Sequence, residues 1–401
     1  MSYTLVTSAK QLKEFCDELA AAEVIAFDTE FVSEHTYRSQ LCLVQVATSK
    51  HLAVIDPLAV SDLSAFWELL AKPGHHTVVH AGREELGFSL SAVNCFPAGL
   101  VDVQIAAGLV SSEYPAGYGS LLSRVLNVSA HKGETRTDWR RRPLSRQQLD
   151  YAVDDVRYLI PLHERLQQRL AKLKRLAWLD DEMNAFQEEV AASRTRERWR
   201  RLSGLSGLST RSLAIAREVW RWREAEAERK DIPPRRVLRD DLLVELARRR
   251  VADPRQIRAV RGMERGDLAA FLPEIALRIK DALEMPAEGL PKSDRRDVPN
   301  QINVLGQFLS TALASLCRSL DLAGALVGTA SDVRDLVAYR LGFINGEPPL
   351  LARGWRAQVI GTLIEDLLAG NLSIRIADPL SDHPLAFEAT ATGPPPQHDR
   401  S

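Results

Sequence analysis

The chain has 401 residues, which is too long for one ordinary domain and suits two or three. Hydrophobic residues make up 45% and charged residues 26% of the sequence, a balance that excludes a wholly disordered or fibrous protein. No apolar run approaches the ~18 residues of a membrane span, and the first residues lack the pattern of a signal peptide. The formal net charge of −1 argues against a nucleic-acid-binding protein if the charge is spread evenly.

The four cysteines are far apart in the sequence and form no CxxC pair. This spacing indicates neither a disulfide framework nor a zinc site. We therefore expect a reducing, cytoplasmic setting.

The charge is not spread evenly. Residues 194–281 contain 23 Lys and Arg against 14 Asp and Glu, a local net charge of +9, so the rest of the chain carries −10. Such an asymmetry usually means that one segment meets a polyanion, although a solvated set of arginine-rich helices would look the same.

Short β-branched runs alternate with amphipathic helical patterns in the first part of the chain and predict an α/β domain there. The predicted strands are 24–31, 41–48, 51–56, 77–81 and 100–104, and the predicted helices are 9–22 and 63–71.

From about Ser145 onward almost no strand signal remains, and the pattern is helical. Residues 144–173 predict one long helix, with Ser145 as its N-cap and a possible bend at Pro161. Ser331 is expected to cap a later helix, and residues 354–370 predict another helix with a terminal glycine. The predicted divisions are a first domain at 1–190, a second at 194–285, a linker at 286–300, a third domain at 301–388 and a disordered tail at 389–401.

Asp28 and Glu30 alternate on one predicted strand, so their side chains project to the same face. Their neighbours are apolar, and two carboxylates in such a strand are costly unless something offsets their desolvation. Mg²⁺ or Mn²⁺ is the common solution, since both ions prefer carboxylate oxygen. For an isolated Asp-x-Glu pair, however, a carboxylate that simply points to solvent is the commoner explanation.

Two further acidic clusters follow. His80, Glu84 and Glu85 lie where a strand meets the next helix, a position at which acidic residues often only complement the helix dipole. Tyr151 and Asp155 are spaced i, i+4 and share a helix face, whereas Asp154 would pair with Arg157 on another side. Four carboxylates and a phenol in this order have the layout of two-metal phosphodiester hydrolysis.

In these motifs the chain resembles the ribonuclease D family, in the DEDDy group of 3′→5′ exonucleases. FDTEFVSEHTYRSQLCLVQVAT, VVHAGREEL and TRTDWRRRPLSRQQLDYAVDDVRYLIPL resemble the three exonuclease motifs, and WRWREAEAERKDIPPRRVLRDDLLVELARRR resembles the HRDC domain. The resemblance implies a ribonuclease H-like α/β domain, a mixed sheet flanked by helices, followed by two all-α HRDC-type domains.

By position, the resemblance makes Asp28, Glu30, Glu85 and Asp155 ligands of two divalent metal ions, Mg²⁺ or Mn²⁺. Tyr151 would orient the attacking water without being ionised. The chain departs from the family at one ligand, because Glu85 stands where the second motif normally has aspartate. The extra methylene moves the carboxylate outward by about 1.5 Å or less, so we expect an active enzyme with a weaker or altered second-metal site.

Several other residues are candidates for substrate binding. Gln45 and His80 could contact substrate or simply pack, and the arginines from Arg140 to Arg142 could hold phosphates or form a solvated loop. In the basic segment, Arg235 and Arg236 are the stronger candidates. The tryptophans there (Trp199, Trp220 and Trp222) could stack on bases, although tryptophan at helical spacing is more often core.

The leading hypothesis is a cytoplasmic, monomeric exoribonuclease that trims RNA 3′ ends and releases nucleoside 5′-monophosphates, with tRNA precursors as the substrates the family implies. A DNA-directed 3′→5′ exonuclease is one alternative, since the sequence alone identifies no residue that would contact the 2′-hydroxyl of RNA. A catalytically weakened nucleic-acid-binding protein is the other, and Glu85 is the one feature that favours it.

Overall fold

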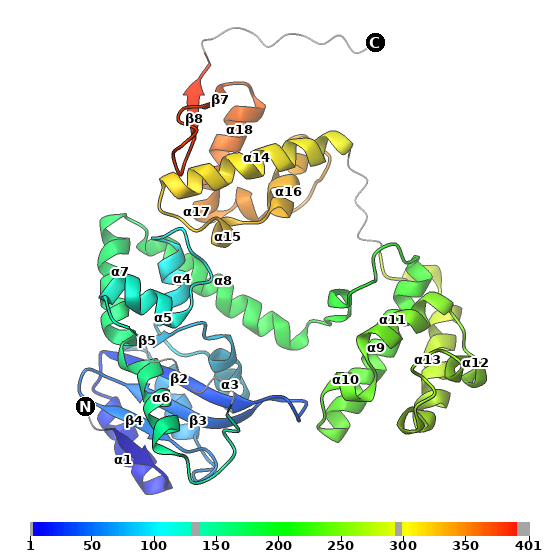
Figure 1. The fold of residues 1–401 in the computed structure, drawn as a ribbon, viewed down its shortest axis with the longest axis horizontal. Coiled ribbons are helices and arrows are strands. Elements are labelled where there is room, and N and C mark those ends of the chain that lie inside the picture. The colour runs from blue at the N-terminus through cyan, green and yellow to red at the C-terminus, as the bar shows by residue number, and fades with distance from the viewer. Residues whose placement is uncertain (1–2, 130–136, 293–298, 391–401) are drawn as a thin grey trace.

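The computed structural model describes residues 3–129, 137–292 and 299–390. In the first part of the chain, which Figure 1 colours blue to green, helices and strands alternate. Its elements are β1 (Thr4–Val6), α1 (Ala9–Leu19), β2 (Val24–Val32), β3 (Gln40–Ala47), β4 (Leu52–Ile55), α2 (Ser64–Ala71), β5 (His76–Val79), α3 (Arg83–Val93), β6 (Leu100–Asp102), α4 (Val103–Gly108), α5 (Tyr118–Leu121), α6 (Arg146–Arg157), α7 (Leu159–Lys172) and α8 (Leu176–Thr195).

A six-stranded mixed sheet forms the centre of this α/β part, in the order β1-β4-β3-β2-β5-β6. β2 pairs antiparallel with β3 and parallel with β5, so it lies inside the sheet with a neighbour on each side. The fold class expected from the sequence is confirmed. The five predicted strands are present within about two residues of their ends, while the three-residue edge strand β1 has too weak a pattern to be recognised.

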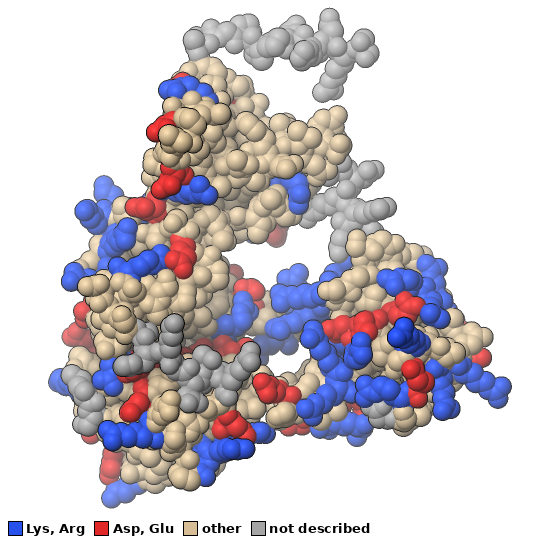
Figure 2. All heavy atoms as spheres, in the orientation of Figure 1, with Lys and Arg blue, Asp and Glu red and all other residues tan. Residues whose placement is uncertain are grey.

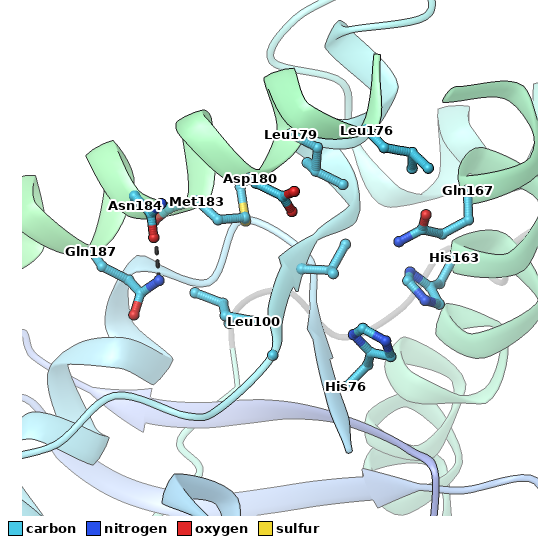
Figure 3. Close-up of a pocket in the computed structure, with 12 residues that line it drawn as sticks. His76, Leu100, His163, Gln167, Leu176, Leu179, Asp180, Met183, Asn184 and Gln187 are labelled. Carbon is cyan, nitrogen blue, oxygen red and sulfur yellow. Dashed lines mark hydrogen bonds between the residues drawn. The ribbon is translucent and has the colours of Figure 1, made fainter. Parts of the chain in front are cut away.

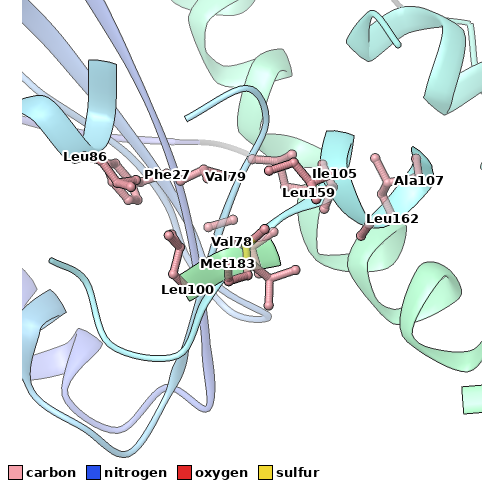
Figure 4. Close-up of a cluster of buried hydrophobic side chains, with 14 of the residues drawn as sticks. Phe27, Val78, Val79, Leu86, Leu100, Ile105, Ala107, Leu159, Leu162 and Met183 are labelled. Carbon is pink, nitrogen blue, oxygen red and sulfur yellow. The ribbon is translucent and has the colours of Figure 1, made fainter. Parts of the chain in front are cut away.

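Apolar side chains from the sheet and its covering helices form one core. Phe27 of β2, Val78 and Val79 of β5 and Leu86 of α3 are fully buried, and Figure 4 shows them beside residues of α4, α7 and α8. This core fixes β2 and β5 between two layers of helices, so the side chains at their carboxyl ends have defined positions.

The predicted long helix at 144–173 is wrong in one respect, because the structure has two helices that meet at Tyr158. Pro161 lies in the first turn of α7, where its missing N–H costs nothing. A continuous helix would place its ring against the carbonyl four residues earlier, so the break precedes the proline. The predicted cap is present: Ser145 and Gln148 form a capping box, with Gln148 N donating to Ser145 Oγ at 3.1 Å.

The second part of the chain has a hydrophobic core of its own. It is built by α9 (Thr210–Lys230), α10 (Pro234–Val237), α11 (Asp240–Arg249), α12 (Pro254–Arg258) and α13 (Leu272–Glu284). Trp222 belongs to this core and meets Phe271 edge-on at 5.4 Å, and Trp220 packs against it partly buried. No helix among the described residues is both long and apolar enough to cross a bilayer.

The third part contains α14 (Asn300–Ser319), α15 (Gly324–Val327), α16 (Ala330–Arg340), α17 (Gly354–Arg356) and α18 (Thr362–Leu368). The helix predicted at 354–370 is present as one helical run, in which a turn of π-helix at Ala357–Gly361 joins α17 to α18. The predicted terminal glycine, Gly370, follows with a positive φ. The cap of α16 is Thr329 rather than Ser331, because Thr329 forms a capping box with Asp332.

This third part is not entirely helical. Leu372–Ile376 (β7) and Leu385–Ala389 (β8) pair as an antiparallel hairpin, which the sequence analysis did not predict. No residue of either strand is buried, so neither has the apolar alternation by which a half-buried strand is recognised. The predicted tail lies outside the described residues from 391 onward.

The third part packs directly on the first. Trp178 of α8 stacks on Trp355 with ring centroids 4.8 Å apart, and the buried Glu182 accepts hydrogen bonds from Trp355 Nε1 (2.8 Å) and Arg356 Nη2 (3.0 Å). Their apolar residues form one continuous cluster. α8 therefore packs against both the first and the third part of the chain, and it then continues toward the second part (Figure 1).

Candidate active site

Asp28 and Glu30 project from the same face of β2, as the alternation predicts. A β-bulge between Glu30 and Phe31 shifts the pairing with β3 just beyond them. Bulges re-aim neighbouring side chains and are frequent beside functional sites. Both side chains are half-buried in the second half of β2, and the charges of Glu85 on α3 and Asp155 on α6 act on both.

Glu85 lies in the first turn of α3 and is only 5% exposed. The start of α3 is held by Asp102, which accepts hydrogen bonds from Ala81 N (3.1 Å) and Gly82 N (2.9 Å). Glu85 Oε1 accepts a 2.5 Å hydrogen bond from Thr29 Oγ1. Thr29 projects from β2 on the opposite side from Asp28. The Glu85 carboxylate is therefore held toward Thr29 and not toward the face that carries Asp28.

α6 supplies Tyr151 and Asp155, which share one face of the helix and lie close enough for each to affect the pKa of the other. The buried ring of Trp139 stacks on Tyr151, with centroids 6.2 Å apart and planes 28° apart. Asp154 points elsewhere and pairs with Arg157 at 2.8 Å, as the sequence indicated. Trp139 thus holds the Tyr151 side chain in place, and the Ser145 cap stabilises the start of the helix that carries it.

Burial raises the pKa values of all four carboxyl groups, and the neighbouring carboxylates add to the shifts of Asp28 and Glu30. Burial, followed by the charges of Glu85, Asp155 and Glu30, raises the pKa of Asp28 well above its usual value. Burial raises the pKa of Glu30 to about 8, with Asp155 and Glu85 adding to it. Burial likewise raises the pKa values of Glu85 and Asp155 to about 7, although hydrogen bonds from Thr29 and Tyr151 oppose the shifts.

The phenol of Tyr151 stays protonated. Burial and the charge of Asp155 raise its pKa further above the ordinary value, and Glu30 and Asp28 act in the same direction. A neutral phenol can donate one hydrogen bond and accept another, which suits a group that positions a water.

The donor set fits hard divalent cations, because it consists of carboxylates alone and no Lys or Arg among the described residues forms an ion pair with any of the four. The side chains as they stand are not at coordinating positions: in the described part of the chain no three His, Cys, Asp or Glu residues form a ready metal cage. The rotation of Glu85 toward Thr29 is one visible reason, and a metal ion would require that side chain or its neighbours to turn.

Gln45 pairs directly with Asp28 across the β2–β3 ladder and is fully buried. Neither atom of its amide has a hydrogen-bond partner among the described residues. His80 is instead engaged, since its Nε2 lies 3.0 Å from Ala116 O and its ring 5.5 Å from that of Tyr118. Gln45 therefore lies beside Asp28 on the same face of the sheet, and His80 packs against Ala116 and Tyr118.

The three arginines ahead of α6 differ in their surroundings. Arg140 is held by Asp138 through Nε (2.8 Å) and Nη2 (3.1 Å), and Arg141 is 86% exposed. Arg142 is an internal tie: it forms two 2.6 Å contacts with Asp56 and donates to backbone carbonyls of Trp139 and Cys42. The exposed Arg141 is thus available to a ligand, whereas the Arg142 side chain is held by contacts within the domain.

The structure does not bring Arg235 and Arg236 to the acidic cluster. Arg235 lies 3.0 Å from Asp240, and Arg236 donates to His35 Nδ1 at 3.0 Å. Trp199, like Trp222, is buried and offers no open ring face.

A pocket of about 360 Å³ opens beside Tyr151 and Asp155, lined also by Tyr118 and Tyr158. Another pocket, of about 720 Å³, lies at the opposite ends of β5 and β6 (Figure 3). It is bordered by His76, His163 and the polar side of α8, and none of the four carboxylates lines it. The smaller pocket is the one that belongs to the acidic cluster.

Comparison with known proteins now decides the family. Residues 3–171 match the model of a 3′-5′ exonuclease, and residues 212–279 match that of the HRDC domain. Ribonuclease D of Granulibacter bethesdensis is 34% identical over 385 residues, which cover 92% of each chain. The chain belongs to the ribonuclease D family. It is therefore a 3′-5′ exoribonuclease.

Other relatives support the same assignment. Ribonuclease D of Acidiphilium cryptum is 33% identical, with 92% of this chain and 94% of that one covered. The crystal structure of Escherichia coli RNase D, described as an exoribonuclease involved in structured RNA processing, matches with a TM-score of 0.81 and 26% identity. That match covers 92% of this chain and 99% of the other.

The sequence did not reveal Thr29, Asp102 or Trp139 as supports of the site. Thr29 is visible only as the residue between two acidic positions, and Asp102 only as an aspartate at the end of a strand. Their partners, Glu85 and the turn at Ala81, are far away in the sequence, so only the folded chain shows the contacts.

Replacement of Asp28 by asparagine should stabilise the metal-free protein at neutral pH. The raised pKa of Asp28 means that folding must either protonate this carboxyl or bury its charge, and an amide of nearly the same shape requires neither. We expect the Tm in chelator to rise by about 2–4 °C, the shift that roughly 1 kcal/mol produces in a domain of this size. Differential scanning calorimetry measures it. Asp17→Asn, on the exposed side of α1, is the matched control and should change little. A lower Tm for Asp28→Asn would contradict the account of the acidic cluster.

Proposed function

We propose that this ribonuclease D-family enzyme hydrolyses the 3′-terminal phosphodiester bond of RNA with two divalent metal ions and releases nucleoside 5′-monophosphates. The observation that carries the proposal is the convergence of β2, α3 and α6, which bring Glu30, Glu85 and Asp155 close enough to Asp28 for their charges to raise its pKa. Tyr151 and Asp155 also line the smaller pocket. Exonucleases of this family are metal-dependent, and the donor set suits Mg²⁺ or Mn²⁺. When bound, such ions lower the pKa of a water and offset charge on the leaving oxygen.

Each side chain has its own proposed role. Asp28, Glu30 and Asp155 would hold the first metal ion, Asp28 would also reach the second, and Glu85 would approach the second through water. Tyr151, with its phenol protonated and braced by Trp139, would orient the attacking water. These roles come from the motif positions, and the shared surroundings of the side chains support them.

Glu85 is proposed to weaken or alter the second-metal site without abolishing activity. Its carboxylate is held by Thr29, so metal binding has to compete with a buried hydrogen bond that an aspartate, one methylene shorter, would not reach in the same way. A group that contacts its metal through water tolerates such a change better than a direct ligand does.

RNA is the proposed substrate because the named relatives are ribonucleases, and structured precursors such as tRNA are the finer expectation. Arg141 and the exposed edge of Arg140 lie on the loop that precedes α6 and are proposed to contact the substrate backbone.

Glu85→Asp tests the second-metal hypothesis. Shortening the side chain should free it from Thr29 and lower the Mn²⁺ concentration for half-maximal activity by about tenfold, the smaller end of effects seen around metal sites. Activity and calorimetric binding should both be titrated with Mn²⁺. Glu84→Asp, its exposed neighbour on α3, is the control. Superimposable curves for the native protein and Glu85→Asp would contradict an altered site.

The activity itself is tested on end-labelled RNA and DNA of matched sequence, with Mn²⁺, with Mg²⁺ and with chelator. We expect metal-dependent shortening of RNA from its 3′ end and a loss of at least about a hundredfold in Asp28→Ala, since a buried charge at the reacting centre is removed. Asp17→Ala, at an exposed position of α1, should retain activity. Equal rates on DNA would contradict the RNA preference, and binding without cleavage would contradict the enzymatic proposal.

A further inference from the structure

Many arginines of α9 to α13 are neutralised by acidic neighbours. Within the described residues, their ion pairs form mostly along or between adjacent helices, for example Arg239–Asp241 at 2.6 Å and Arg249–Glu245 at 2.7 Å. Further pairs include Arg217–Glu218, Arg221–Glu218, Arg223–Asp240, Arg229–Glu226, Lys230–Glu226, Arg235–Asp240, Arg248–Glu245 and Arg278–Glu274. The +9 of this segment therefore overstates the charge that these helices offer to a polyanion.

The arginine-rich segment between α8 and α9 is different. Residues 194–201, which we call the connector, contain five arginines and one acidic residue, Glu197. Glu197 is already paired with Arg221 of α9. Four exposed connector arginines have no carboxylate partner in the described part of the chain, and these are Arg194, Arg196, Arg198 and Arg201.

The connector is anchored at both ends, so these arginines have a defined place. The buried Trp199 fixes the connector against the start of the HRDC helices. At the other end, Glu189 of α8 pairs with Arg83 of α3 at 2.7 Å. Arg83 is two residues before Glu85, and Arg194 follows Glu189 by five residues, about 8 Å along the helix. The connector therefore leaves the catalytic domain close to the element that carries Glu85.

A second contact between the catalytic domain and the HRDC helices lies near the connector. The chain between β2 and β3 reaches α9, where Tyr37 N donates to Asp231 at 3.0 Å and Arg38 pairs with Glu228 at 2.6 Å. Burial and the charges of Glu224 and Glu228 raise the pKa of Tyr37, and the nearby Arg198 opposes them. Arg198 thus lies close to the continuation of the strand that bears Asp28 and Glu30. Figure 2 shows Lys and Arg side chains gathered where α8 meets the HRDC helices, facing the hollow between the two parts.

We propose that the connector is a contact surface for the phosphate backbone of the single-stranded RNA segment that leads to the 3′ end. Guanidinium groups suit this role because they are always charged and match phosphate oxygens in pairs. Contacts of this kind position the strand and carry no sequence preference. The inference rests on the proposed function, since it names where that substrate is held.

The test compares two triple variants that remove the same charge. One is Arg196→Gln, Arg198→Gln and Arg201→Gln in the connector. The control is Arg255→Gln, Arg258→Gln and Arg261→Gln, at and just beyond α12, which lies on the side of the HRDC helices away from the catalytic domain (Figure 1). Binding of a single-stranded RNA of about twenty nucleotides is measured in chelator over a range of salt concentrations.

Each lost phosphate contact lowers the slope of log affinity against log salt by about 0.7. We expect the connector variant to lose about two units of slope and at least about tenfold in affinity, and the control variant to match the native protein. Equal slopes and affinities for the two variants would overturn the proposal.

A dinucleotide separates this inference from the activity itself, because it is too short to extend from the pocket along the connector. Its rate of hydrolysis should be the same in the connector variant and the native protein, while the KM for the longer RNA rises. A connector variant with dinucleotide hydrolysis reduced as much as its RNA binding would contradict a backbone-contact role. If the native protein cleaves nothing, the proposed function fails, and the salt slopes still decide whether the connector binds RNA.

Discussion

Repulsion between buried carboxylates is the constraint on which this site depends. Burial, followed by the charges of Glu85 and Asp155, raises the pKa values of both Asp28 and Glu30, and no basic residue in the described ranges pairs with any of the four. Such a cluster persists only where the surrounding structure over-determines it. Here β2 is paired on both sides, Asp102 holds the start of α3, and α6 has a capping box at its start.

The sequence predicted the parts of the site that follow from local periodicity. Strand alternation places Asp28 and Glu30 on one face, and i, i+4 spacing does the same for Tyr151 and Asp155, so these neighbours needed no tertiary information. The direction of Glu85 could not be predicted, because it depends on Thr29, fifty-six residues away. The β7–β8 hairpin was missed for a related reason: its strands are too exposed to show the alternation that burial imposes.

Net charge also changes its meaning once the fold is known. The net charge of the whole chain is near zero although its second part is basic. Within that second part some arginines form ion pairs with carboxylates and others do not. Exposed ion pairs add little to stability, but they do reduce the field that a polyanion meets. The number of basic residues in the sequence is therefore a weaker guide to an RNA-binding surface than the partners those residues have in the structure.

The central claim is that β2, α3 and α6 build a site for divalent cations from Asp28, Glu30, Glu85 and Asp155. Anomalous diffraction from crystals grown with Mn²⁺ tests it most directly, because the ion is located independently of any assay. The account predicts anomalous peaks in contact with Asp28, Glu30 and Asp155, with Glu85 turned away from Thr29 or linked to an ion through water. Mn²⁺ bound elsewhere, with these four carboxylates free of it at a saturating concentration, would contradict the account.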